Sequence, residues 1–209
     1  MRRRRRRPRV LAQVPAGPDP AARPGVLRRD ELAAYSRLAD ALKGVRMVLA
    51  IGPAKSRVAV GLATLAAARG RRAALVEADL GDPSLAARLG LERAPGLHEY
   101  LRGDVGPREV LQSLVLAGPA SGRAVEPLTC IVAGAPGRPE LLDTRRCRRA
   151  LGGLRSNYDL VVIDGVSLDV ERLGLIALAM AADASLACGT AGQLRGKLPI
   201  PVTGLVTVA

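Results

Sequence analysis

The chain has very few aromatic and sulfur-containing side chains. Only 1% of its 209 residues are aromatic, and it contains neither Trp nor Phe. The core must therefore be built from Ala, Leu, Val and Ile, and the chain lacks the side chains on which single-strand nucleic-acid binders stack bases. This scarcity argues against nucleic acid as a partner. The three cysteines, Cys130, Cys147 and Cys188, are odd in number and far apart, which predicts buried free thiols rather than disulfides or a zinc site.

Long hydrophobic runs are also missing. The longest one, residues 173–182, is well short of the roughly 18 residues that a membrane-spanning helix needs. The N-terminus is basic like a signal peptide, but Gln13 and Pro15 interrupt the apolar stretch that such a peptide requires. We therefore expect a cytoplasmic protein. The single histidine, His98, has no Ser or Cys at a catalytic spacing, and we predict that it lies on the surface.

Positive charge is concentrated at the N-terminus. Residues 1–29 carry ten arginines and one aspartate, and so account for +9 of the formal net charge of +13. We interpret them as a basic, Pro-rich, disordered tail and linker, followed by one domain over residues 30–209. The tail either stays solvated or binds a polyanion such as an anionic membrane surface. A second basic cluster, residues 145–149, predicts a solvated helix face.

Apolar segments of strand and helix type alternate along the chain. The expected strands are 45–51, 73–77, 128–133, 159–163, 184–188 and 202–208, and the expected helices are 30–42, 56–69, 83–89, 96–101, 107–114, 139–154 and 171–181. Continuous apolar strands are typical of a parallel sheet with helices on both faces. The sequence thus predicts an α/β fold: a doubly wound, mostly parallel sheet in a P-loop NTPase-like three-layer sandwich. Ligands of such folds bind at the carboxyl ends of the strands.

A phosphate-binding loop is predicted where the strand 45–51 meets the helix that follows it. Lys55 and Ser56 match the end of the motif G-x-x-x-x-G-K-[ST], in which glycines let backbone N–H groups turn toward phosphate. Ala54 stands where the last glycine belongs, and Leu49 stands where the first one does, inside the strand. The loop is therefore shortened.

Carboxylates follow two other expected strands. Glu77 and Asp79 come after residues 73–76, and Asp164 comes after residues 160–163. Mg²⁺-nucleotide chemistry requires oxygen ligands opposite a Lys-Ser loop. One such acid often only caps a turn, but three in register with Lys55 indicate a nucleotide site.

These residues resemble a known family, the bacterial tyrosine kinases of capsule and exopolysaccharide export, within the MinD/ParA group of P-loop ATPases. Seven segments are similar to the family's motifs in the same order: 9–15, 34–42, 55–63, 75–83, 95–103, 133–142 and 158–164. The first corresponds to the link between membrane region and kinase domain, the third to the Walker A helix, the fourth to the second acidic motif and the last to Walker B.

The resemblance implies ATP and Mg²⁺ as cofactors and assigns a role to each site residue. Lys55 contacts the β- and γ-phosphates, Ser56 binds Mg²⁺, Asp79 assists metal or base chemistry, and Asp164 is the Walker B carboxylate. The expected catalytic residues are Lys55, Asp79 and Asp164; the expected nucleotide-binding residues are Gly52, Lys55, Ser56 and Arg57; and the expected metal ligands are Ser56, Glu77, Asp79 and Asp164.

Several positions depart from the family pattern. Arg57 replaces a Thr, Glu77 replaces an Asp, and residues 165–167 replace Thr-Pro-Pro. In the first helix Ala33, Ser36 and Ala39 replace the Glu-x-x-Arg-x-x-Arg contact motif, which puts ring assembly in doubt, and the C-terminal tyrosine cluster is absent. Phosphoryl transfer depends on positioning, so these departures predict weak or lost catalysis.

The sequence leaves three functions open. The first is an ATP-binding, tyrosine-kinase-like protein of exopolysaccharide or capsule biosynthesis or export, acting beside a membrane polysaccharide co-polymerase or adaptor at the inner face of the membrane. The second is a MinD/ParA-type positioning ATPase. The third is a non-catalytic scaffold that keeps the fold.

Overall fold

The computed structural model describes residues 8–17, 27–116, 126–166, 172–195 and 198–209, and these form one eight-stranded sheet covered by helices. The strands are β1 (Val10–Val14), β2 (Met47–Ile51), β3 (Ala73–Glu77), β4 (Gln112–Leu114), β5 (Leu128–Ile131), β6 (Leu160–Asp164), β7 (Ala184–Gly189) and β8 (Gly204–Val208). The helices are α1 (Arg29–Ala41), α2 (Lys55–Ala68), α3 (Leu85–Leu89), α4 (Leu97–Arg102), α5 (Arg145–Asn157) and α6 (Arg172–Ala181), with short 3₁₀ helices η2 (Pro139–Asp143) and η3 (Gln193–Arg195).

The sheet has the order β1-β8-β7-β2-β6-β3-β5-β4. Every pairing is parallel except that of β4 with β5, which is antiparallel. Strands β2, β3 and β6 are buried along their whole length, as expected for central strands with helices on both faces. Strand β2 lies between β6 and β7 and is parallel to both, so the carboxyl ends of these three strands lie side by side. The predicted α/β doubly wound fold is confirmed.

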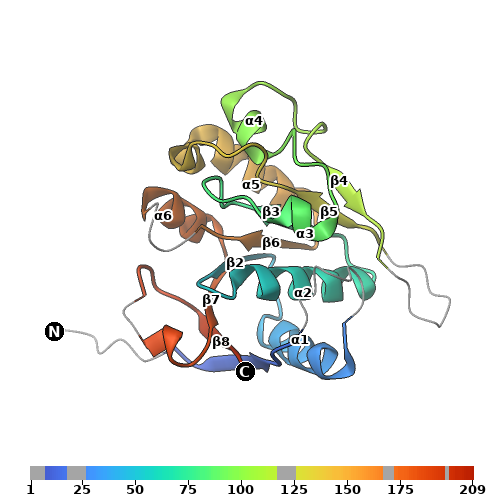
Figure 1. The fold of residues 1–209 in the computed structure, drawn as a ribbon, viewed down its shortest axis with the longest axis vertical. Coiled ribbons are helices and arrows are strands. Elements are labelled where there is room, and N and C mark those ends of the chain that lie inside the picture. Colours follow the sequence, from blue (N-terminus) through green and yellow to red (C-terminus); the bar gives the residue numbers. More distant parts are fainter. Residues whose placement is uncertain (1–7, 18–26, 117–125, 167–171, 196–197) are drawn as a thin grey trace.

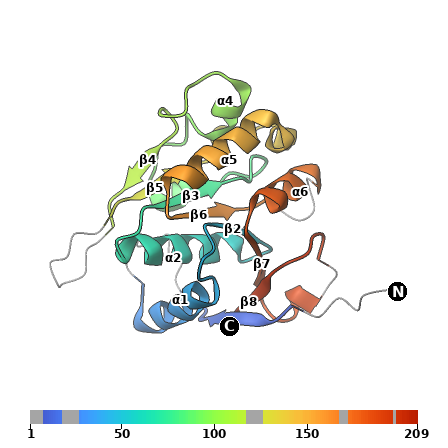
Figure 2. The same cartoon turned by 180° about the vertical axis from the view of Figure 1, so that it is seen from behind.

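Helices cover both faces and give the predicted three layers. One core cluster joins α1, α2 and α3 to the sheet, and the other joins α4, α5 and α6 to the opposite face. Figures 1 and 2 show α2 and α5 on opposite sides of the central strands. On the first face the Tyr35 ring packs against α2 at Gly61, where a Cβ atom would lie 2.1 Å from the ring. Gly61 therefore permits the close contact of α1 with α2.

Part of the expected tail belongs to the sheet. Val10–Val14 forms β1, which pairs with β8, so these residues correct the assignment of 1–29 to a disordered segment. The alternating pattern explains the strand: Ala12 and Val14 are buried and Gln13 is exposed. The rest of the predicted tail falls mainly on residues 1–7 and 18–26, which lie outside the described residues.

Two predicted helices are wrong. The segment 107–114 ends in the edge strand β4, where pairing with β5 and the exchange of hydrogen bonds between Gln112 and Glu92 override the helical pattern. The predicted helix 139–154 is divided into η2 and α5 at Thr144. This residue has an extended backbone, and its hydroxyl accepts from the Cys147 amide at 3.2 Å, so it caps a new helix.

The described helices are all too short or too polar to cross a lipid bilayer. The three cysteines are free and buried, as the sequence predicts.

Candidate nucleotide-binding site

The predicted loop connects β2 to α2 through only three residues, Gly52, Pro53 and Ala54. Gly52 has a φ of 98°, and a Cβ atom there would lie 2.5 Å from the carbonyl oxygen of Cys188 on β7. Only glycine fits so close to β7 in this conformation. The loop is therefore pressed against the end of the neighbouring strand.

Two backbone amides at this loop already have hydrogen-bond acceptors within the protein. The Ala54 amide donates to the Cys188 carbonyl at 3.1 Å, and the Lys55 amide donates to the Gly52 carbonyl at 3.1 Å. Pro53 has no amide hydrogen to donate. A phosphate-binding loop works because several such N–H groups face the ligand. Here three consecutive positions contribute none, since two amides are already bonded and the third is a proline.

The Lys55 ammonium lies between two carboxylates at the strand ends. Its Nζ is 3.2 Å from Asp79 Oδ2 and 3.2 Å from Asp164 Oδ1. Burial alone would lower the pKa of Lys55, but the two carboxylates outweigh it and raise the pKa above its usual value. Lys55 is therefore a charged residue held in a small buried ion network, as the convergence of β2, β3 and β6 predicts.

Asp164 is the most deeply buried member of this network. It has no exposed surface, and its Oδ2 has no hydrogen-bond partner among the described residues. Burial raises the pKa of this carboxyl, while Lys55 and the Ser56 hydroxyl oppose the shift. An unpartnered carboxylate oxygen beside a hydroxyl fits the oxygen ligands that Mg²⁺ takes. Ser56 and Asp164 are the residues that would hold the ion.

Glu77 has a different environment from the other two acids. Its Oε1 accepts the Ser84 and Leu85 amides at 2.6 and 2.7 Å, and its Oε2 accepts the Ala133 amide at 2.9 Å. The carboxylate thus joins β3 to the start of α3 and to the chain after β5. No three acidic, His or Cys side chains of the described ranges gather in an arrangement suited to a metal ion. Glu77 lies next to Asp164 across the β3–β6 pairing, but its carboxylate binds main-chain amides, whereas Asp79 and Asp164 contact Lys55.

The Arg57 side chain extends to the N-terminal segment. Its guanidinium donates to the carbonyls of Gly17 at 2.8 Å and Pro15 at 2.9 Å, and to Glu31 Oε1 at 2.7 Å. Glu31 is 2% exposed, and it also accepts the Arg28 amide at the start of α1. This ion pair fastens α2 to α1 and to the residues after β1, so the guanidinium is committed to these contacts.

Two groups that shape the site were not predicted from the sequence: the Cys188 carbonyl and the Glu31 carboxylate. The carbonyl that closes the loop belongs to Cys188, and a main-chain atom leaves no signal in the sequence. Glu31 could have been found as an acid three residues after the N-cap residue Arg28, a capping pattern.

His98 differs from expectation. It is 6% exposed and packs on Gly137, so the predicted surface position is wrong. The solvated face predicted for the arginine cluster is confirmed for Arg145, Arg148 and Arg149, which are exposed, while the half-buried Arg146 guanidinium lies 4.7 Å from the centroid of the Tyr100 ring.

This fold and this ion network are those of a P-loop NTPase-like protein. No protein-family model matches the chain. In sequence it is similar to two proteins named putative tyrosine-protein kinase EpsB. It is 35% identical to that of Ralstonia nicotianae over 127 residues, 58% of this chain and 16% of that protein, and 30% identical to that of Ralstonia solanacearum over 166 residues, 73% of this chain and 20% of that protein. The chain thus spans a fifth or less of these relatives.

Solved structures share the fold. The chimerical protein CapA2B2 superposes with a TM-score of 0.81 at 16% identity, covering 96% of this chain and 94% of that one. The kinase domain of the Escherichia coli tyrosine kinase ETK gives 0.76 at 19% identity, covering 96% and 91%. The septum site-determining protein MinD of Pyrococcus horikoshii, complexed with Mg-ADP, gives 0.51 at 20% identity, covering 69% and 58%. The chain is a relative of the bacterial tyrosine kinases, with the fold that they share with MinD/ParA-like ATPases, and the resemblance noted from the sequence is confirmed.

Proposed function

We propose that the chain is a tyrosine-kinase-like P-loop protein of exopolysaccharide or capsule biosynthesis or export in which phosphoryl transfer is weak or lost. The relatives named as tyrosine kinases support the class. The main support for weak or lost phosphoryl transfer comes from the loop, because its Ala54 amide is bonded to the Cys188 carbonyl and the Lys55 amide to the Gly52 carbonyl. Catalysis of phosphoryl transfer rests on such positioning groups.

Residual binding of Mg²⁺-ATP or Mg²⁺-ADP is part of this proposal. Lys55, Ser56 and Asp164 retain the side-chain groups for this binding: a phosphate would share the Lys55 ammonium with Asp79 and Asp164, and Asp164 Oδ2 would accept the ion. Hydrogen bonds to a charged group contribute about 1.5–3 kcal/mol each, so two missing amide donors weaken binding by roughly 100-fold or more. Nucleotide binding should therefore be weak and should depend on these side chains.

Calorimetric titration with Mg²⁺-ADP tests the proposal through a gain of binding. A variant with three residues inserted after Pro53, together with Ala54→Gly, restores the full motif G-x-x-x-x-G-K-S. We expect it to bind about 100-fold more tightly than the natural chain, because free amides replace the Ala54 amide, which is bonded to β7, and the Lys55 amide, which is bonded to Gly52. Lys43→Met is the control and should bind like the natural chain, because this exposed lysine precedes β2 and so lies at the opposite end of that strand from the loop. Tight binding by the natural chain, with no gain on insertion, would contradict the proposal.

A non-catalytic scaffold is the second candidate, and one observation favours it. The Lys55 ammonium already has two carboxylate partners at 3.2 Å, so the site is electrostatically complete without a nucleotide. The same titration separates the two functions, because a scaffold shows no heat of binding at millimolar Mg²⁺-ADP. A MinD/ParA-type positioning ATPase needs ATP binding for its switch, so the closed loop weighs against that alternative.

The proposed partner is a membrane polysaccharide co-polymerase or adaptor at the inner face of the membrane. The arginines before β1 suit an anionic lipid surface, at about 1 kcal/mol for each arginine near it. Deleting residues 2–9 should abolish binding to phosphatidylglycerol vesicles, while phosphatidylcholine vesicles bind neither form. Binding that survives the deletion and 0.5 M salt would exclude the electrostatic anchor, since surface attraction is screened within about 10 Å at 0.1 M salt.

A further inference from the structure

A groove lies beside α5, on the face of the sheet opposite α2. Its volume is about 540 Å³, and its apolar floor includes Val76 of β3 and Ile131 of β5. One wall is α5 from Cys147 to Asn157, and the other is formed by residues 97–111. At 1.5 Å per residue the α5 wall is roughly 15 Å long, and the volume is within the range of ligand-binding pockets, about 300–1,000 Å³. None of the nucleotide-site residues lines it.

A glycine keeps this groove open. Gly153 lines it, and a Cβ atom at this position would meet no atom within 4 Å. Gly152, its neighbour in α5, has equally free surroundings but does not line the groove. A glycine inside a helix costs about 1 kcal/mol relative to alanine. The chain thus bears this cost at a position where any larger side chain would enter the groove.

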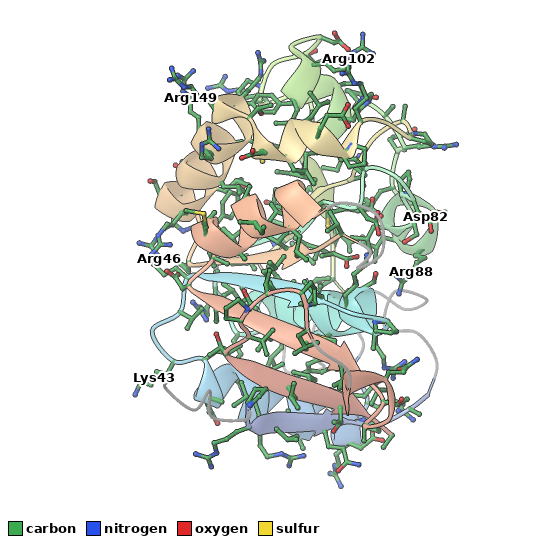
Figure 3. The ribbon with its side chains drawn as sticks, turned by 90° about the vertical axis from the view of Figure 1, so that its left-hand side faces the viewer. Lys43, Arg46, Asp82, Arg88, Arg102 and Arg149 are labelled. Carbon is green, nitrogen blue, oxygen red and sulfur yellow. The ribbon has the colours of Figure 1, made fainter. Side chains whose placement is uncertain are left out.

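The rim of the groove is positive. Arg108 and Arg149 line it from opposite walls, both are exposed, and neither forms an ion pair with any described residue. Figure 3 shows Arg149 extending outward from α5. Leu111, 41% exposed, adds an apolar side chain to the rim. No Asp or Glu is among the described residues that line the groove. A ligand with an apolar side and flanking negative charges complements these walls.

We propose that this groove binds an acidic amphipathic helix of a partner protein. An amphipathic helix laid in a groove inserts apolar side chains spaced i, i+4 and i+7, which matches a wall about three helical turns long. Acidic residues on its flanks reach Arg108 on one wall and Arg149 on the other. The lining residues, which follow α5 from Cys147 to Asn157, and the two arginines on opposite walls favour a helix over a compact ligand with a single anionic group. The proposal does not depend on nucleotide binding.

The test uses two fluorescein-labelled synthetic helices of roughly 16 residues, long enough to run along the groove. Both carry leucines at i, i+4, i+7 and i+11; one has glutamates on the flanks and the other has lysines. Fluorescence anisotropy with the full chain should show binding of the acidic helix and binding of the lysine helix at least 10-fold weaker. Equal binding of both, or no binding of the acidic helix at millimolar protein, would overturn the proposal.

Variants then locate the contact. Gly153→Leu should weaken binding of the acidic helix at least 10-fold, while Gly152→Leu, the matched change outside the groove, should leave it unchanged. Both variants remove a helix glycine, so neither is expected to lose its fold. Arg149→Glu should weaken binding about 5-fold or more, while Arg145→Glu, exposed on the same helix and not lining the groove, should not. Unchanged binding in Gly153→Leu would contradict the proposal.

A lipid chain is the alternative occupant that the experiment distinguishes. Laurate and phosphatidylglycerol vesicles are added as competitors to the bound acidic helix. We expect neither to displace it at submillimolar concentration. Displacement, or vesicle binding that Gly153→Leu removes and Gly152→Leu keeps, would show that the groove takes a lipid and would overturn the assignment to a helix.

Discussion

Replacing Lys55 by methionine should lower the free energy of unfolding, because it leaves the buried Asp164 carboxylate without its cation. Lys55 is 13% exposed, Asp79 10% and Asp164 not at all, with both carboxylates 3.2 Å from the ammonium. Removing one member of a buried ion pair costs about 3–5 kcal/mol. Some solvent reaches Lys55 and Asp79, so we expect the lower end, about 3 kcal/mol. Equilibrium urea unfolding measures it, with Lys43→Met as the control at under about 0.5 kcal/mol.

A double-mutant cycle shows whether the cost comes from Asp164. Adding Asp164→Asn to Lys55→Met should recover at least about 1.5 kcal/mol, because the uncompensated charge is removed. The deficit of Lys55→Met should also shrink as the pH falls from 8 to 5. Without the ammonium the pKa of Asp164, already raised by burial, rises further, and its ionisation no longer opposes folding below that pKa. A loss below about 1 kcal/mol for Lys55→Met, or no recovery in the double variant, would refute the buried network.

Two further predictions concern the packing of α1 on α2 and the hydrogen bonds of Asp183. Gly61→Ala should lower the free energy of unfolding by about 1–3 kcal/mol in urea, because the new Cβ would lie 2.1 Å from the Tyr35 ring, whereas Gly152→Ala on an open helix face should raise it by up to about 1 kcal/mol; stabilisation in both would contradict the packing. Burial would raise the pKa of Asp183, but two amides at 3.0 Å and the Arg155 guanidinium at 2.6 Å hold it below its ordinary value of 3.8, so Asp183→Asn should cost about 1–2 kcal/mol at pH 7. Because this stabilisation is present above the unfolded-state pKa and is lost as pH falls through the lower folded-state value, the Asp183→Asn deficit should shrink as the pH falls below 3.8, and a deficit independent of pH would contradict it.

The central strands could be predicted from the sequence, because strands that are buried on both faces consist of uninterrupted apolar residues. Strands β2, β3 and β6 are continuous apolar runs, and a parallel arrangement brings their carboxyl ends together. Lys55, Asp79 and Asp164 meet for this reason, although they are far apart in the chain. The edges are less predictable, because β1 and β4 each pair with a single neighbour, β8 and β5, and β4 has only three residues.

The hydrogen-bond partners of the site residues could not be predicted from the sequence. The bond from the Ala54 amide to Cys188 involves two main-chain groups, and it arises because Gly52 approaches β7. The direction of the Arg57 side chain is set by Glu31 and by the carbonyls of residues 15 and 17, which are distant in sequence. Likewise, Glu77 bonds three amides that only the folded chain brings to it.

A single-turnover assay with γ-labelled ATP and Mg²⁺ tests the central claim most directly: that the chain does not catalyse phosphoryl transfer, because the amides of its shortened loop are already hydrogen-bonded. The protein is held in excess over ATP, and both released phosphate and phosphotyrosine are followed over hours. Kinases of ordinary activity turn over at about 1–100 per second. We predict no transfer above that of Mg²⁺-ATP alone, with no label on Tyr35, Tyr100 or Tyr158. Complete conversion within minutes, or stoichiometric labelling of any of these tyrosines, would contradict the account.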